Sequence, residues 1–476
     1  MISFLLTRVF AFSPFVRLQV SSLLNRTTLS SKFFANKFWD GNKNGQASFL
    51  LREGVLLTML MTVPDCSYSQ DSIQYIPDGT QGEFLEVVKS DTLPEKWKDK
   101  RWRLFPGKLS TFKIGAALFY DYAGFHQDDN SKRQADSADY VVESAFKIRD
   151  FRFLLSGQFK TKRTISWKAG IMYDGVTDSW FLRETGIMIG VPELWGHFFI
   201  GRTKEGFSLN KVMNAASLWG IERQMAFDVI PILADGVKWL GYVPKQRILW
   251  NIGVYADWLS DSQSFSTYKW QTVARIGWLP IYSQGDKTVL HVAVNYRYGK
   301  PDDDEIRLRS RPESNPAPYF IDTGKISTNG SNHLGGEVYF SKGPWMFGSE
   351  FYAHYFNSPT TATKIFHEGD LLVSYFITGE TRPYSTVSGV YGFVPVARPV
   401  FKGGPGAWEA LLRYSNFDLD DGPVHGGKFW KITSMVNWYV SKEVRFGFAY
   451  GYGVLDRFNL KGATQFFQTR LLLSLL

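Results

Sequence analysis

Basic side chains that recur at every second position are the residues of this sequence best suited to chemistry. In the run from 444 to 452, Arg445 shares a face with glycine and alanine, whereas Phe446 and Phe448 occupy the opposite face. Arginine suits oxyanions because its planar fork donates two parallel hydrogen bonds, and rings of Arg and Lys around a pore favour anions. The candidate pore-lining anion contacts of this kind are Lys113, Arg247, Arg275, Arg297, Arg413, Lys431 and Arg445.

The same polar faces also carry carboxylates, at Asp121, Asp257, Glu350 and Glu409. A wall of mixed charge is what a weakly selective channel needs. Each basic candidate therefore either contacts a permeant anion, pairs with a carboxylate of the wall or faces bulk water. These alternatives stay open at this point.

Two segments, 300–332 and 379–406, interrupt the alternation and are rich in Pro, Gly and charge. Loops this long in a compact fold are usually functional or mobile, and in a barrel one of them would cap the mouth or fold into it. The acidic run Asp302-Asp303-Asp304-Glu305 could hold a divalent cation, but a solvated loop partly neutralised by the arginines that follow is the preferred interpretation. The candidate constriction residues of the two loops are Arg307, Arg309, Arg311, Arg382, Arg398 and Lys402.

Motifs for catalysis or cofactor binding are missing from the sequence. It has seven histidines without an H-E-x-x-H pair, one cysteine, no G-x-S-x-G turn and no Walker loop. The cluster Gly403-Gly404-Pro405-Gly406 opens no helix, so it indicates a tight loop rather than a phosphate cradle. We therefore predict no enzyme activity, no cofactor and no metal site.

The elements that must position these side chains are strands, because the dominant period from about residue 111 is two. Phe112–Asp121 and His291–Tyr298 both alternate apolar with polar or small residues, and turn signals such as Asp174-Gly175 and Asn329-Gly330 separate such runs. The 476 residues include 39 Phe, 23 Tyr, 16 Trp and 43 Gly, a composition typical of many aromatic-faced strands joined by glycine-bearing turns.

The distribution of apolar residues favours strands that cross a membrane. No stretch approaches the roughly 18 continuous apolar residues of a membrane helix, and the mean hydropathy is −0.18. Aromatic pairs such as Trp430 and Trp438 bracket strand-length spans, as in the girdles of outer-membrane barrels. The sequence therefore predicts an all-β fold, a transmembrane antiparallel β-barrel. The alternative is a secreted β-sandwich that binds glycans through exposed aromatics.

The charge balance and the start of the chain add two expectations. The net charge of +9 comes without any block of consecutive basic residues, so no nucleic-acid partner is expected. Arg52, the apolar run 55–63 and the small or polar residues 64–70 are typical of a secretory signal peptide, preceded by a translation start that is placed too early. Cys66 follows Asp65, which argues against lipidation. Accordingly, residues 1–70 are assigned to this start and signal, 71–110 to a polar lead-in, and 111–476 to the barrel.

Several ordered motifs resemble a known family. The C-terminal third contains Gly379-Glu380-Thr381-Arg382-Pro383-Tyr384, then Val396-Ala397-Arg398-Pro399, then Gly404-Pro405-Gly406-Ala407-Trp408-Glu409. Earlier come the stretch 201–209, with its Lys204-Glu205 pair, and Ile221-Glu222-Arg223. In this order the motifs resemble the phosphate-selective porin O and P family of outer-membrane channels, over roughly residues 111–476.

The resemblance implies a sixteen-stranded barrel in the bacterial outer membrane, in contact with outer-membrane lipid. It also implies a homotrimer and passive diffusion of small anionic solutes such as phosphate. Sixteen strands leave about 23 residues for each strand with its connection, which suits ~10-residue strands and long outer loops. Two departures matter: the chain ends in Leu475-Leu476 rather than an aromatic residue, and the arginine ladder and lysine cluster of the family cannot be placed by motif. Selectivity for phosphate is therefore not carried over.

Overall fold

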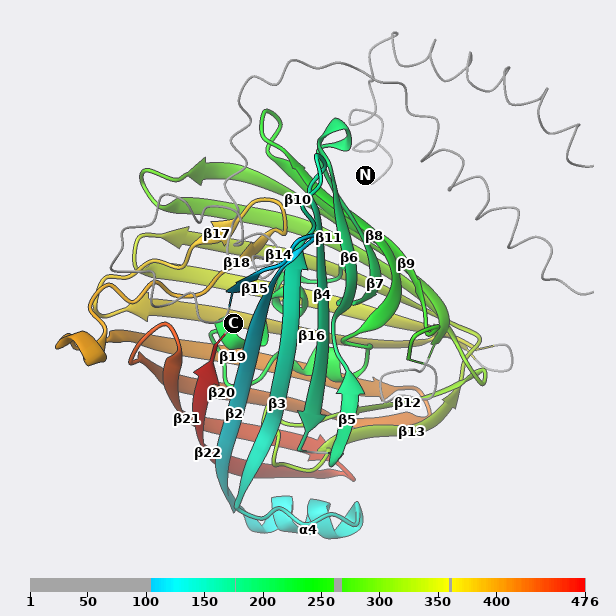
Figure 1. Ribbon diagram of the computed structural model, residues 1–476. Helices are drawn as coiled ribbons and strands as arrows, with labels where there is room; N and C mark the ends of the chain where they lie inside the picture. The colour runs from blue at the N-terminus through cyan, green and yellow to red at the C-terminus, as the bar shows by residue number, and fades with distance from the viewer. Residues whose placement is uncertain (1–103, 176, 261–267, 359–361, 476) are drawn as a thin grey trace, which may run out of the picture. The chain divides into compact units, whose positions relative to one another are not determined.

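The computed structural model describes residues 104–175, 177–260, 268–358 and 362–475. The predicted signal segment 1–70 and residues 71–103 of the lead-in lie outside these ranges. Most of the described chain forms long antiparallel strands, each paired with its neighbours in the sequence (Figure 1). The strands of the main sheet are β1 (Leu104–Pro106), β2 (Thr111–Gln127), β3 (Ala145–Gln158), β4 (Ile165–Asp174), β5 (Ser179–Leu182), β6 (Thr185–Val191), β7 (Gly196–Thr203), β8 (Ala234–Val243), β9 (Ile248–Ala256), β10 (Tyr268–Ser283), β11 (Thr288–Pro301), β14 (Gly330–Lys342), β15 (Trp345–Asn357), β16 (Lys364–Phe376), β19 (Ala407–Asp421), β20 (Val424–Tyr439), β21 (Val444–Arg457) and β22 (Leu460–Ser474).

The sheet closes on itself where β2 pairs with β22, in a register that places Asp121 opposite Arg470. Strands β5 and β6 both pair with β4 and form one interrupted barrel strand, while the short β1 pairs only with the start of β2. Counted this way, the barrel has 16 strands. Closure gives each long wall strand a partner on both sides, as a membrane requires, because it does not tolerate unpaired backbone groups. The predicted fold is confirmed.

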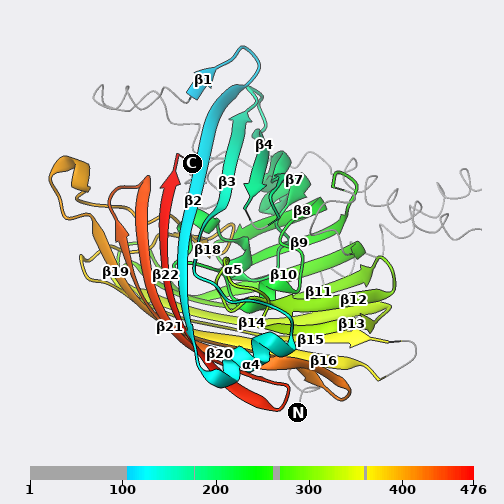
Figure 2. The same cartoon turned by 90° about the horizontal axis from the view of Figure 1, so that it is seen from below.

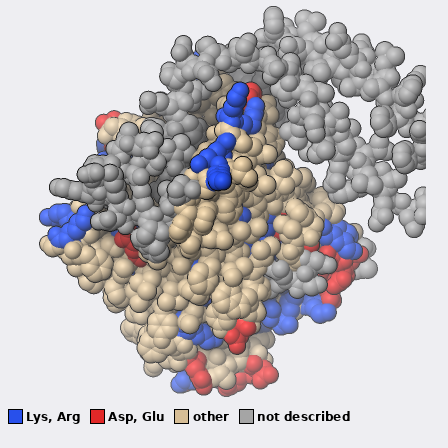
Figure 3. All heavy atoms as spheres, in the orientation of Figure 1, with Lys and Arg blue, Asp and Glu red and all other residues tan. Residues whose placement is uncertain are grey.

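The two faces of the wall differ as the alternation predicts. On β21 the side chains of Phe448 and Tyr450 are 46% and 43% exposed, whereas Arg445 and Ala449 on the opposite face are buried. The outward aromatic and aliphatic residues give the wall a largely uncharged surface, and Lys, Arg, Asp and Glu gather toward its ends (Figure 3). A β-sandwich would bury the aromatic face, so this inverted arrangement excludes the sandwich alternative.

The strands alternate in direction, so their connections fall at two ends. The short-turn end holds the connections 159–164, 192–195, 244–247, 284–287, 343–344 and 440–443, together with the longer 377–406. The long-loop end holds 128–144, which contains the helix α4 (Asp129–Ser137), together with 204–233, 302–329 and the tight turns before β20 and β22. Figure 2 shows α4 beside the end of β2 and the start of β22. Among the described residues, no helix has the length and apolarity to cross a membrane.

Three of these connections fold into the barrel rather than away from it. Segment 204–233 holds α5 (Leu209–Val212), η3 (Ala215–Ser217) and η4 (Met225–Asp228); segment 302–329 holds β12 (Glu305–Ser310) and β13 (Ile321–Ser327); segment 377–406 holds β17 (Tyr384–Ser385), β18 (Val390–Tyr391) and η5 (Val400–Lys402). Trp219 of the first segment packs against Tyr391 of the last, with ring centroids 6.3 Å apart. Segments that enter from opposite ends therefore meet inside the bore. The predicted breaks at 300–332 and 379–406 match two of them, and segment 204–233 was not foreseen as a loop.

Candidate functional site in the bore

Carboxylates of the inner wall hold the start of segment 204–233. Glu350 on β15 accepts hydrogen bonds from Ser208 Oγ (2.7 Å) and from the Asn210 backbone N–H (3.0 Å). Glu337 on β14 accepts one from the Leu209 backbone N–H at 3.0 Å. The first N–H groups of a helix have no partner within the helix, so these two acids satisfy donors that α5 leaves unpaired. The acids of this part of the wall thus anchor the backbone of segment 204–233.

Basic residues of the wall hold the later part of the same segment through its carbonyl oxygens. Arg413 on β19 donates to Glu222 O at 3.1 Å, and Arg445 on β21 donates to Leu218 O. Asn437 on β20 donates to Trp219 O at 2.8 Å. Arg413 also pairs with Glu313 of segment 302–329, at 2.5 Å. Three side chains of the β19–β21 wall, one on each strand, therefore hold chain that crosses the bore.

Segment 377–406 is fixed by a second buried network. Arg275 on β10 donates to Ser388 O (3.1 Å) and Gly389 O (2.8 Å), and it also pairs with Glu337 at 2.7 Å. His291 Nδ1 lies 2.7 Å from the Tyr384 hydroxyl oxygen. The network holds the β17–β18 hairpin, which also packs against Trp219, to the wall. Arg275, predicted as an anion contact, therefore positions the backbone of this hairpin.

Two further predicted residues act in the same manner. Arg382, predicted as a constriction residue, is buried and forms an ion pair with Glu409 at 2.7 Å, while donating to Ser217 O at 2.9 Å. Lys431 on β20 donates to Pro312 O at 2.9 Å in segment 302–329. Each therefore joins an inner segment to the wall or to another inner segment.

A different arrangement of charge occupies the opposite part of the wall, around Glu184. Lys168 on β4 lies 3.6 Å from this carboxylate, Arg183 lies 3.7 Å from it, and Lys204 at the start of segment 204–233 lies 4.0 Å from it. Lys238 on β8 donates to Thr203 Oγ1 at 2.9 Å and to Lys204 O at 3.2 Å, and its charge also acts on Glu184 and Lys168. We call Glu184 and these four basic residues the Glu184 cluster. Four basic side chains thus surround one carboxylate, so basic groups outnumber acids in the cluster.

The local chain geometry explains how the cluster forms. Between β5 and β6 the pairing with β4 shifts by one residue, from Ile171↔Leu182 to Lys168↔Gly186. An extra residue of this kind is a β-bulge, and bulges re-aim side chains. As a result the adjacent residues Arg183 and Glu184 both have largely buried side chains, 7% and 14% exposed. The same break leaves Arg183 Nε buried without a hydrogen-bond partner among the described residues.

The two lysines of segment 204–233 titrate in unusual surroundings. Burial lowers the pKa of the Lys204 ammonium well below its usual range, and the nearby Glu184 carboxylate opposes only part of that effect. Lys204 Nζ donates to Val212 O (3.2 Å) and Met213 O (2.7 Å). Burial also lowers the pKa of Lys211 to about 8, although its ion pair with Glu205 at 2.6 Å favours the charged form.

The remaining predicted wall residues divide into three cases. Arg297 on β11 is buried and pairs with Glu205 of segment 204–233 at 3.0 Å. Lys113 lies on β2 close to the short-turn end and is half-buried. The predicted wall position of Arg247 is wrong, because β9 begins at Ile248 and Arg247 is an exposed turn residue with a φ of 56° that donates to Pro280 O at 3.1 Å.

The remaining predicted loop residues also separate in space. Arg307 is exposed and pairs with Asp322 at 2.5 Å, so the hairpin β12–β13 neutralises it. Arg309 and Arg311 both lie over the Tyr319 ring, at 4.3 and 4.0 Å from its centroid. Arg398 and Lys402 are exposed at the short-turn end rather than inside the bore, since segment 377–406 turns outward before η5.

Sequence reasoning missed most of the Glu184 cluster. Lys168 and Lys238 each stand between apolar neighbours in short alternating runs, Ile165–Asp174 and Ala234–Val243, so strand parity could have found them. Lys204 was inside a recognised motif but was not assigned to the bore. Arg183 had no such signal, because the bulge breaks the alternation on which parity depends. Within the described ranges, no group of three or more His, Cys, Asp or Glu residues is arranged to hold a metal ion.

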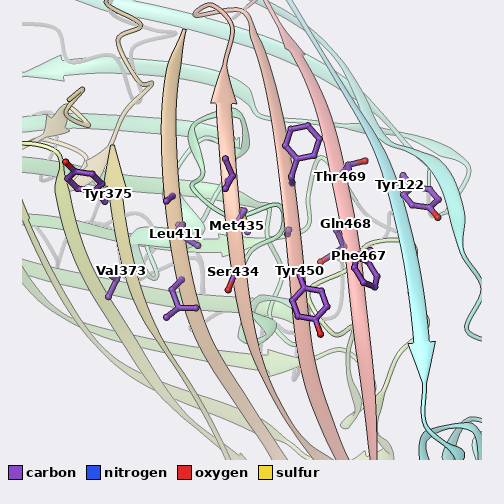
Figure 4. Close-up of a pocket in the computed structure, with 15 residues that line it drawn as sticks. Tyr122, Val373, Tyr375, Leu411, Ser434, Met435, Tyr450, Phe467, Gln468 and Thr469 are labelled. Carbon is purple, nitrogen blue, oxygen red and sulfur yellow. The ribbon is translucent and has the colours of Figure 1, made fainter. Parts of the chain in front are cut away.

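The outer face of the wall also has a shallow groove, of about 830 Å³, across β16, β19–β22 and β2 (Figure 4). Its small floor residues Ala410 and Ser434 lie between larger outward side chains such as Leu412, Phe448 and Tyr450. The groove is lined almost wholly by uncharged side chains and is continuous with the apolar outer surface.

Comparisons with known proteins agree with this architecture. Residues 119–470 match the family described as phosphate-selective porin O and P. Porin O of Pseudomonas aeruginosa is 26% identical over 384 residues, which cover 72% of this chain and 83% of that protein. An uncharacterized protein of Caulobacter vibrioides is 31% identical over 159 residues, which cover 33% of this chain and 31% of that protein. Among solved structures, outer-membrane expressed OmpT of Vibrio cholerae superposes with a TM-score of 0.50 at 9% identity, covering 78% of this chain and 99% of that chain.

Proposed function

This chain belongs to the phosphate-selective porin O and P family, as its motifs predicted, and we propose that it conducts small anions, phosphate among them, by passive diffusion through the bore. The chain is a protein of the bacterial outer membrane. In this proposal the Glu184 cluster, rather than the whole set of basic wall residues, sets the preference for anions.

The observation that carries the proposal is the excess of basic side chains around Glu184. Lys168, Arg183, Lys204 and Lys238 gather around one carboxylate, whereas Arg275 and Arg413 each form an ion pair with a separate acid. A permeant anion loses part of its hydration in a narrow passage, and clustered ammonium and guanidinium groups replace that hydration. The buried Arg183 Nε is a donor that an oxyanion would accept from.

Two members of the cluster, Lys168 and Glu184, are more exposed than the anchoring residues, whereas Arg183, Lys204 and Lys238 are as buried as the anchors Arg413 and Arg445. The side chains of Lys168 and Glu184 are 11% and 14% exposed, whereas those of Arg275 and Glu337 are 0% exposed. A group that keeps some contact with solvent can exchange water for a passing ion, and a fully enclosed ion pair cannot do so without breaking. This difference supports the assignment of conduction to the β4–β8 side of the bore.

The remaining proposals for the whole protein come from the family resemblance and from the sequence patterns described above. We propose a homotrimer whose outer faces contact outer-membrane lipid, with the short-turn end toward the periplasm, since outer-membrane barrels have short periplasmic turns and longer extracellular loops. We also propose that the chain catalyses no reaction, takes no cofactor and binds no nucleic acid. The mature chain is proposed to begin after residue 70.

Planar-bilayer recordings test the proposed selectivity. In a KCl gradient the wild-type reversal potential should indicate a preference for chloride, and phosphate added to one side should compete with the chloride current. A triple substitution, Lys168→Gln, Lys204→Gln and Lys238→Gln, should move the reversal potential toward cations and weaken the effect of phosphate. The matched control removes three exposed lysines of the long-loop end, Lys132, Lys325 and Lys461, and should leave selectivity unchanged. A cation-preferring wild type, or a triple variant that keeps its selectivity, would refute the proposal.

A further inference from the structure

Exposed lysines recur at the short-turn end, in one connection after another. The connection 159–164 carries Lys160 and Lys162, and the turns 244–247 and 284–287 carry Lys245 and Lys287. Lys342 stands at the turn after β14, and Lys442 at the turn after β20. Because these connections belong to strands all around the barrel, their ammonium groups form a ring at the rim rather than a single patch.

The acids of this rim are few and are held by neighbouring side chains. Glu193 pairs with Arg163 at 2.9 Å. Asp286 accepts a hydrogen bond from Ser283 Oγ at 2.8 Å, and Glu443 accepts one from Ser441 Oγ at 2.9 Å. The six lysines named above outnumber these three acids, so the ring keeps a net positive charge.

The opposite end of the barrel has a different charge balance. Its connections carry Asp129 and Asp136 on α4 and the acidic run that includes Asp303 and Asp304, interspersed with lysines. The Lys461–Asp456 and Lys325–Glu305 ion pairs, at 3.3 and 2.7 Å, are typical of this end. The excess of positive charge is thus a property of the short-turn rim, not of the exposed surface in general.

The best-defined pair of lysines in the ring comes from two adjacent turns. Thr288 pairs with Lys342 across β11 and β14, and the Gly343 N–H donates to Lys287 O at 3.1 Å, so Lys287 and Lys342 belong to neighbouring turns. Lys342 is also the cross-strand partner of Trp345. Directly opposed residues of an antiparallel pair point to the same face, so Lys342 shares the outer face with the Trp345 ring, which is 45% exposed.

Exposed tryptophan side chains lie near the short-turn end of the wall, close to the ring of lysines. The side chains of Trp195, Trp278 and Trp345 are 49%, 54% and 45% exposed. Tryptophan at the ends of membrane strands lies at the headgroup level, because one part of the ring is apolar and its N–H is polar. Lysines placed beside such rings on the outer face therefore lie near lipid headgroups, not in the path of a permeant ion.

We propose that the short-turn rim binds the anionic headgroups of phospholipids in the adjoining leaflet, with Lys287 and Lys342 sharing one phosphate. The inference rests on the outer-membrane placement and the orientation given above, but not on the selectivity of the bore. The attraction is between ammonium groups and lipid phosphates near the surface, so it falls with ionic strength over a Debye length of about 8–10 Å.

Spin-label electron paramagnetic resonance on the refolded full chain tests the proposal. In phosphatidylcholine bilayers, the protein should retain spin-labelled phosphatidylglycerol over spin-labelled phosphatidylcholine by about fivefold at low salt, and the preference should shrink at high salt. Substituting four rim lysines by glutamine should abolish most of this preference; the four are Lys160, Lys162, Lys287 and Lys342. A matched control set at the long-loop end should keep it; this set is Lys132, Lys269, Lys428 and Lys461.

Several outcomes would overturn the lipid assignment. One is a wild type without preference for phosphatidylglycerol, and another is a control set that loses as much preference as the rim set. Sedimentation of the wild type with peptidoglycan, without any lipid preference, would assign the rim to that polymer instead. Reversal potentials recorded in pure phosphatidylcholine separate the two proposals, because the rim variant should keep the wild-type anion selectivity there. A rim variant that changes selectivity but not lipid preference would show that the ring acts on permeant ions.

Discussion

The inner wall of β14–β21 and the inner wall of β4–β8 carry similar charged residues and use them differently. On the first, Glu350 and Arg445 hold the backbone of segment 204–233. On the second, Lys168 and Arg183 are among the basic side chains that surround Glu184. The difference lies in the charge balance: the first wall pairs its bases with acids and with backbone groups of the inner segments, whereas the second gathers four basic side chains around one carboxylate.

Removing an anchor should have the largest effect. Glu350→Ala leaves Ser208, the Asn210 N–H and the hydroxyls of Tyr339 and Tyr352 without their acceptor. Each buried donor left unsatisfied costs roughly 1–3 kcal/mol, so segment 204–233 should detach from β15. Single-channel recordings should then show a larger and noisier conductance. Glu350→Gln, which keeps an acceptor oxygen, should restore much of the wild-type behaviour; an unchanged conductance in the alanine variant would contradict the anchoring role.

Two lysines of the inner wall allow a matched test of the comparison. Lys168→Gln should lower the anion-to-cation permeability ratio by about fivefold, the effect of the ~1 kcal/mol attraction between unit charges 4 Å apart in water. Lys431→Gln should leave that ratio nearly unchanged but loosen segment 302–329, because it removes the bond to Pro312 O. Reversal potentials and limited proteolysis measure the two effects. If both variants change selectivity equally, the two walls do not differ in role.

Alkaline pH should weaken the anion preference moderately. Burial lowers the pKa of Lys204, so its ammonium loses the proton at a lower pH than an ordinary lysine does, and the cluster then loses one positive charge. Reversal potentials should therefore move toward cations as the pH rises, at a pH well below the ordinary lysine pKa of about 10.4. Lys204→Arg stays protonated up to that pH and should flatten the response. A wild type whose selectivity does not change as the pH rises to that value would argue against Lys204 as part of the site.

The smallest expected effect concerns the β17–β18 hairpin. Gly389 has a φ of +65°, and a Cβ there would lie 2.8 Å from Leu249 Cδ1 and 2.9 Å from Arg275 Nη1. Gly389→Ala should cost about 1 kcal/mol for the backbone conformation plus the cost of this crowding. Gly379→Ala is the control, because Gly379 has a φ of +87° with nothing near its Cβ position. In thermal unfolding in detergent, the midpoint temperature of Gly389→Ala should be lower than that of Gly379→Ala. Equal midpoint temperatures would show that the crowding at Gly389 has no energetic cost.

Strand parity predicted the wall well and the bore less well. The faces of β21 were assigned correctly from alternation alone, because a side-chain period of two is fixed by the backbone. Parity gives no assignment for Arg183 and Glu184, because a bulge adds a residue between β5 and β6. A bulge depends on how two strands pair, so the alternation of apolar and polar residues within one strand does not reveal it.

The roles of the predicted basic residues were beyond the sequence for another reason. Arg275, Arg413 and Lys431 lie on the wall, but each also donates to a carbonyl oxygen at least 113 residues away in the chain, for example Ser388 O for Arg275. Every residue has such a carbonyl, so no residue type marks the partner. Only the path of the inner segments, which depends on the closed barrel around them, decides which charges become anchors.

The seam between β2 and β22 links barrel closure to the filling of the bore. Arg470 pairs with Asp121 across the seam at 2.6 Å, a contact between residues separated by 349 positions, and it also contacts Glu222 and Ile221 O of segment 204–233. Contacts this distant in sequence form late, because the entropy of closing the loop must be offset first. The last strand therefore gains its full set of partners only if the segment already lies inside. We expect a chain that closes around a misplaced segment to seal slowly and reopen readily, so that the final step of assembly discriminates filled barrels from unfilled ones.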